Sequence, residues 1–177
     1  MLHATQSPRG CNALGTALKG GIYGNFTETV FFKEPINVAG FAYTTFSGTV
    51  IWPANMVSTG SVNPFYTFTC QKLIMLEGFT WSFHWSAFYY ANIHTIVFPS
   101  TIPIIPNVSK SNFNGTCKLV INGSNVIPIA EQSYYKPKYN IFAYVPDELV
   151  SAYKIEESWQ TNFNIDKILP LSEYVED

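Results

Sequence analysis

The stretch from Phe79 to Phe98, FTWSFHWSAFYYANIHTIVF, restricts the possible folds more than any other part of the chain. It is long enough to cross a bilayer as a helix, which takes about 20 apolar residues. A membrane-spanning helix would be apolar throughout, whereas this stretch carries Ser, His, Asn and Thr at alternate positions. Alternation with a period of two is typical of a strand. We therefore predict a central core strand, or a hairpin of two strands, and no membrane span.

Rings are the second feature of this stretch. Its apolar parity is formed by Phe79, Trp81, Phe83, Trp85, Ala87, Tyr89, Ala91, Ile93 and Val97. Phe88 and Tyr90 interrupt the polar parity, so we expect these two rings to contact another molecule. The segment SYYKPKY adds Tyr134, Tyr135 and Tyr139, whose alternation with lysines and a proline is typical of contact loops. These five rings form the predicted interaction surface.

Further strand signals occur on both sides of this stretch. Residues 63–76 alternate in the same way, and Asn122-Gly123 lies between two apolar runs, as in a type I′ hairpin turn. No internal repeat is evident at a fixed spacing. Aromatic residues make up 16% of the chain and charged residues only 12%, which favours strands. We predict an all-β fold, mainly an antiparallel β-sandwich or jelly roll with roughly eight to ten strands and a short C-terminal helical or irregular appendage.

Composition divides the chain into three parts. Residues 1–24 are rich in glycine and are predicted to form a flexible N-terminal arm. Residues 25–145 carry the strand signals and are predicted to be the β-sandwich domain. Residues 146–177 begin with a proline and two acids, which favour a helix start, so we expect a short helix at about 147–158. Pro170 prevents a long helix beyond it, and the final YVED is expected to be solvated.

Charge is distributed unevenly along the chain. Residues 35–109 carry only Lys72 and Glu77, whereas residues 146–177 carry ten charges. A soluble monomer usually exposes charged side chains on nearly every strand. The middle of the chain is therefore either covered on both faces, by a second sheet or another subunit, or exposes a neutral polar and aromatic surface. A deep single-domain core with a hydroxyl-rich exterior is the remaining interpretation.

No motif for catalysis or for a cofactor is present. The cysteines, Cys11, Cys70 and Cys117, are odd in number and widely spaced, and the last two lie on apolar parities, which predicts small core side chains. Neither the three histidines nor the scattered carboxylates show the spacing of a metal site or a glycosidase pair. A net charge of −2 argues against nucleic-acid binding. We predict no catalytic, cofactor or metal residues.

These observations lead to three functional predictions. The first is a non-enzymatic structural subunit of a viral or phage particle, such as a capsid-decorating, minor capsid or tail-fibre protein. It would contact copies of itself or other virion proteins and would assemble in the host cytoplasm, since no signal peptide is recognisable. The second is a carbohydrate-binding or receptor-binding β-sandwich module that contacts a surface glycan. The third is an unrecognised hydrolase.

Overall fold

The fold was derived from a computed structural model of the chain. The structure describes residues 11–13, 25–26, 30–32, 45–52, 54, 65, 67–80, 88–106, 108, 116–131 and 140–176.

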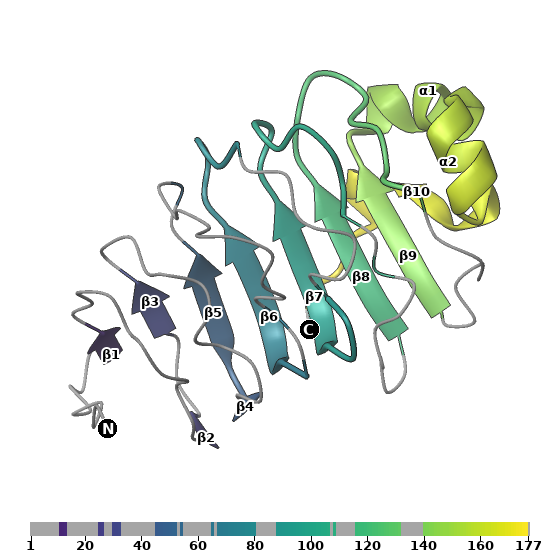
Figure 1. The fold of residues 1–177 in the computed structure, drawn as a ribbon. Helices are drawn as coiled ribbons and strands as arrows, with labels where there is room; N and C mark the ends of the chain where they lie inside the picture. Colours follow the sequence, from purple (N-terminus) through teal and green to yellow (C-terminus); the bar gives the residue numbers. More distant parts are fainter. Residues whose placement is uncertain are drawn as a thin grey trace.

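The described strands form a single ten-stranded sheet, and every pairing in it is parallel (Figure 1). The strands are β1 (Cys11–Ala13), β2 (Asn25–Phe26), β3 (Val30–Phe32), β4 (Thr45–Phe46), β5 (Thr49–Trp52), β6 (Thr69–Met75), β7 (Asn92–Phe98), β8 (Thr116–Ile121), β9 (Asn140–Val145) and β10 (Ile168–Pro170). Their order is β1-β3-β5-β6-β7-β8-β9-β10, with β2 beside β4 and β4 beside β6. The predicted antiparallel sandwich is therefore wrong. A parallel sheet followed by helices belongs with α/β-type folds.

The pairing register repeats at an almost constant interval. Thr49 pairs with Lys72, Lys72 with Thr95, and Thr95 with Lys118, so the step in sequence from strand to strand is the same each time. Glu77 and Ser100, which hydrogen-bond across one such step, are 23 residues apart. Strands that follow one another in sequence and in the sheet at this interval are successive turns of a solenoid, in which each turn contacts mainly its neighbours. The expectation that the chain has no internal repeat is wrong.

The core lies on one face of the sheet, called here the inner face. Two rows of apolar side chains cross the strands, and every member except Pro170 at the end of the second row is at most 2% exposed. The first row comprises Val50, Leu73, Ile96, Leu119, Ala143 and Ile168, and the second comprises Trp52, Met75, Phe98, Ile121, Val145 and Pro170. Phe65 and Phe88, which are separated by the same step in sequence, stack in the core with ring centroids 4.7 Å apart. Like positions of successive turns therefore stack on like positions.

A bulge explains why simple alternation misplaced some side chains. Cys70 and Leu73 both face the core, although strict alternation would place them on opposite faces. Between them, the amides of Gln71 and Lys72 both donate to the carbonyl of Gly48, at 3.1 and 3.4 Å. Two residues opposite one is the arrangement of a β-bulge, which shifts the parity of the strand by one place. On the next strand, Val97 likewise lies half-buried on the face opposite to Ile93, where alternation had placed the two together.

The predicted hairpin at Asn122-Gly123 is also wrong. β8 ends at Ile121 and pairs in parallel with β7 and β9, not with the residues that follow the turn. The Asn122 amide donates to the Phe98 carbonyl of the preceding turn, at 3.1 Å. Gly123 has a φ of +147°, which explains why a glycine suits this corner. The Asn-Gly pair ends a strand here and does not reverse the chain onto it.

The C-terminal helices close the end of the core beyond β8 and β9 (Figure 1). The 3-10 turn η2 (Asp147–Leu149) leads into α1 (Val150–Ile155), and Glu156 separates α1 from α2 (Glu157–Asn162). The short helix predicted at about 147–158 is thus confirmed, although it forms in pieces and continues to Asn162. A second 3-10 turn, η3 (Ile165–Lys167), leads directly into β10.

Polar side chains of these helices hydrogen-bond to the backbone of the last solenoid turn. The Ile127 amide donates to the Tyr153 hydroxyl at 3.1 Å, and the Ile127 carbonyl accepts from Trp159 Nε1 at 2.9 Å. The Ile129 amide donates to Ser158 Oγ at 3.0 Å. These backbone groups of Ile127 and Ile129 would otherwise have no following turn to pair with, so the helices act as a cap.

Candidate functional site

The face of the sheet opposite the core, called here the outer face, carries two rows of side chains of its own. The pairing register places Thr49, Lys72, Thr95, Lys118 and Phe142 in one row, and Ile51, Ile74, Val97, Val120, Tyr144 and Leu169 in the other. One row thus alternates basic and hydroxyl side chains before ending on a ring, and the other is apolar. Such a mixture suits contact with another chain better than contact with water alone.

Part of the outer face is buried even though it lies outside the core. Thr95 is 3% exposed, Val120 5% and Tyr144 9%, and none of these belongs to the core cluster. They lie on the adjacent strands β7, β8 and β9. On β5 and β6, by contrast, Ile51 and Ile74 are only half-buried. Something must therefore cover the outer face from β7 to β9.

The covering element is the end of the described chain. After β10, the 3-10 turn η4 (Leu171–Glu173) reverses the chain, and residues 174–176 return across the sheet toward β7 (Figure 1). The Tyr174 ring meets the Tyr144 ring of β9 edge-on, with centroids 5.3 Å apart. Lys118 of β8 donates to the Val175 carbonyl at 2.9 Å, and Lys72 of β6 forms an ion pair with Glu176. This end is largely exposed, as predicted, but it also makes specific contacts with the sheet.

Charge on the outer face is of one sign. Lys72 and Lys118 lie in its first row, and Lys167 reaches its end, where Nζ lies 5.2 Å from the centre of the Phe142 ring. Lys167 also donates to Asn140 Oδ1 at 2.9 Å. No Asp or Glu occupies an outward position of the described strands β5 to β10. The face is therefore suited to an anionic partner, and residues 174–176 supply such a group themselves.

A carboxylate at the helical cap anchors the covering segment. Asp147 Oδ1 accepts a hydrogen bond from the Ser172 amide at 3.0 Å. Hydrogen bonds from the Ser172 side chain and backbone lower the pKa of Asp147, with a smaller contribution from Leu171. Asp147 therefore stays ionised and fixes the point at which the chain turns back over the sheet.

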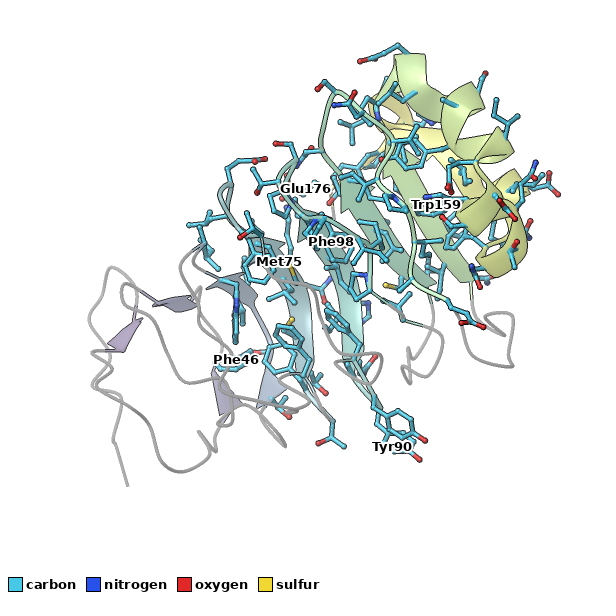
Figure 2. The ribbon with its side chains drawn as sticks, turned by 45° about the horizontal axis from the view of Figure 1, so that its top comes forward. Phe46, Met75, Tyr90, Phe98, Trp159 and Glu176 are labelled. Atoms are coloured by element: carbon cyan, nitrogen blue, oxygen red, sulfur yellow. The ribbon has the colours of Figure 1, made fainter. Side chains whose placement is uncertain are left out.

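The structure separates the five rings predicted to form an interaction surface. Phe88 is 1% exposed and stacks within the core, whereas Tyr90 is 42% exposed and projects away from the labelled core residues (Figure 2). Tyr90 meets Tyr89 edge-on at 4.3 Å and has a φ of +58°. Tyr134, Tyr135 and Tyr139 lie outside the described residues. The structure therefore does not bring the predicted set together.

Side chains considered for catalysis have structural roles where they are described. Cys70 and Cys117 are buried, which confirms the prediction that they are core side chains, and burial raises the pKa of each thiol. Glu77 accepts two hydrogen bonds from Ser100, from the amide at 2.9 Å and from Oγ at 2.7 Å. Among the described residues, no three His, Cys, Asp or Glu side chains gather as a metal site would require. The same residues include no helix with the length and hydropathy of a membrane span.

Sequence reasoning missed the outer face because it missed the repeat. Lys72 and Lys118 lie two turns of the solenoid apart, a spacing that is visible in the sequence once the period is known. The same period places Val97 and Val120 side by side. Nothing in the sequence signals that residues 174–176 return to these strands. No family model, curated protein or solved structure matches the chain.

Proposed function

We propose that the protein is a non-catalytic binding module that contacts other proteins through the outer face of its sheet. The supporting observation is a continuous face that combines a basic row with an apolar row and carries no carboxylate at the described outward positions. A stack of parallel turns is a rigid support for such a face, so little conformational entropy is lost on binding.

The distribution of charge supports the same proposal. Lys72 and Glu77, the two charged residues of segment 35–109, both contact other parts of the chain: Lys72 pairs with Glu176, and Glu77 with Ser100. Neither side chain therefore interacts with water alone. We keep the subunit of a viral or phage particle as the setting for this module, because low charge is suited to surfaces that become buried between subunits. A monomer at all micromolar concentrations by light scattering would contradict that setting.

Selection from a random peptide-display library tests whether the outer face binds protein. The wild-type chain is expected to enrich a set of peptides, and Lys118→Glu is expected to weaken their binding at least tenfold, because it reverses a central charge. Lys154→Glu, on α1, is the matched control and should leave binding unchanged. Peptides that bind wild type and Lys118→Glu equally, or no enrichment at all, would refute the proposal.

Tyr90 gives a reason to retain glycan binding as a second candidate. It is exposed beside a second tyrosine, and flat rings of this kind stack on sugars. Glycan-array signal that disappears in Tyr90→Ala would support this candidate, and an unchanged signal would exclude Tyr90 as its site. The third candidate, a hydrolase, has no supporting constellation in the described part of the chain.

A further inference from the structure

Residues 174–176 occupy the outer face through a small number of contacts. A ring pair, a lysine that contacts both a backbone carbonyl and the Tyr174 ring, and an ion pair join them to β9, β8 and β6. The Glu176 side chain remains 68% exposed and Val175 71% exposed. Because the Glu176 carboxylate is largely open to solvent, this ion pair adds little to the stability of the chain. The segment is thus held by few contacts, which an incoming chain could replace.

The contacts also specify what could replace the segment. Tyr144 packs against an aromatic ring, and Lys118 donates to a carbonyl oxygen while its Nζ lies 5.6 Å from the centre of the Tyr174 ring. Lys72, two strands away, pairs with a carboxylate two places after the ring. The contacts fall on β9, β8 and β6 in that order, so the segment crosses the strands and does not run along one of them.

We infer that the outer face from β6 to β9 is a docking surface for an extended acidic peptide with the pattern aromatic-any residue-carboxylate, and that residues 174–176 hold this surface in the unbound protein. The inference deepens the proposed function and rests on it. The evidence is an occupant already in place, complementary charge, and the contact of the buried Tyr144 with the Tyr174 ring.

Competition with a tethered segment sets the affinity that an incoming peptide needs. A tethered competitor acts at an effective concentration of the order of millimolar. A partner that repeats only the three contacts would therefore bind weakly. One that also covers the half-buried Ile51 and Ile74 gains additional apolar burial. The partner is thus expected to extend beyond the pattern toward β5.

The test uses the full chain and a fluorescent peptide with the sequence of residues 171–177, LSEYVED. In a released variant, Tyr174→Ala with Glu176→Ala, the outer face loses its occupant. The peptide is expected to bind this variant at least tenfold more tightly than wild type by fluorescence anisotropy. Adding Lys72→Glu to the released variant should abolish the gain, and a peptide with Lys in place of its carboxylate at the Glu176 position should restore binding to that triple variant.

Circular dichroism and light scattering establish that the variants remain folded. If the released variant does not fold, the single variant Glu176→Lys, at a largely exposed position, replaces it with the same expectation at a smaller gain. Equal peptide affinity of the wild type and the folded variant, or an affinity that Lys72→Glu leaves unchanged, would overturn the inference. So would a concentration-dependent dimer that disappears in the released variant, because the segment would then occupy a second copy of the chain.

Failure of this inference and failure of the proposed function give different results. Display-selected peptides that depend on Lys118 but lack the aromatic-any residue-carboxylate pattern would preserve the binding module and refute the inference. Absence of any Lys118-dependent peptide would refute both.

Discussion

The two faces of this sheet have the same strands and the same repeat, but they differ in how completely their side chains are buried. On the inner face, successive turns place side chains such as Leu73 and Ile96 in direct contact, buried completely and packed on both sides. On the outer face, the neighbouring Ile74 and Val97 form an equally regular row that is only half-buried. The comparison shows that regular stacking by itself does not make a core; covering does. The outer face, which residues 174–176 cover only in part, is therefore the one that we propose a partner contacts.

The largest expected effect comes from truncating adjacent residues on opposite faces. Leu73→Ala removes a fully buried side chain and should lower the free energy of unfolding by about 2–5 kcal/mol. Ile74→Ala removes a similar volume from the half-buried outer row and should cost less than half as much. Urea unfolding followed by tryptophan fluorescence measures both. Equal losses would mean that the outer face is as closely packed as the inner one.

A smaller effect concerns the protons of the buried thiols on the inner face. Burial raises the pKa of Cys70 and Cys117, so the folded chain keeps both protons at a pH where the unfolded chain releases them, above about 8.5. The contribution of these protons to stability is therefore fully present below that pH. Above it, the free energy of unfolding should fall by roughly 1.4 kcal/mol per pH unit for each thiol.

Cys117→Ala isolates this contribution. The variant should halve the slope of stability against pH between about 8.5 and 10, whatever its stability at pH 7, as measured by urea unfolding under reducing conditions. A slope identical to that of wild type would show that Cys117 does not keep its proton when folded.

The smallest effect concerns the anchor of the covering segment. Asp147→Asn removes the charge that accepts from Ser172, so residues 171–176 should be held less firmly, and the LSEYVED peptide should bind slightly better than to wild type. The gain should be smaller than that of Glu176→Lys. Because the pKa of Asp147 is lowered, the anchor is present above the ordinary pKa of an aspartate and is lost as the pH falls through the folded value. Glu148→Gln serves as the control, and an equal gain there would remove the role assigned to Asp147.

Local structure was predictable from sequence to the extent that it depends on local chemistry. The strand at Asn92–Phe98, the helical segment after Pro146 and the buried Cys70 and Cys117 all follow from alternation, capping and parity. Pairing direction was not predictable in this way, because alternation and an Asn-Gly turn are equally compatible with a hairpin and with the corner of a solenoid.

The repeat was hard to see in the sequence because the inner face accepts different apolar side chains at the same position of successive turns. The first row holds valine, leucine, isoleucine and alanine at the same place in successive turns, so the period is kept in shape and not in letters. Bulges such as the one at Gln71 further shift the parity within a strand. The return of residues 174–176 depends on a contact between Glu176 and Lys72, 104 residues apart, which no local pattern reports.

The constant interval between strands has a consequence for how such a chain can change in length. An insertion or deletion of one whole interval would add or remove one strand, one pair of inner side chains and one pair of outer ones, and would leave every other neighbour in register. The distance between Lys72 and Lys118 would change by one strand spacing, about 4.8 Å, at each step. Duplication of a gene segment could thus lengthen the outer face that a partner contacts, while the packing within each turn stays the same.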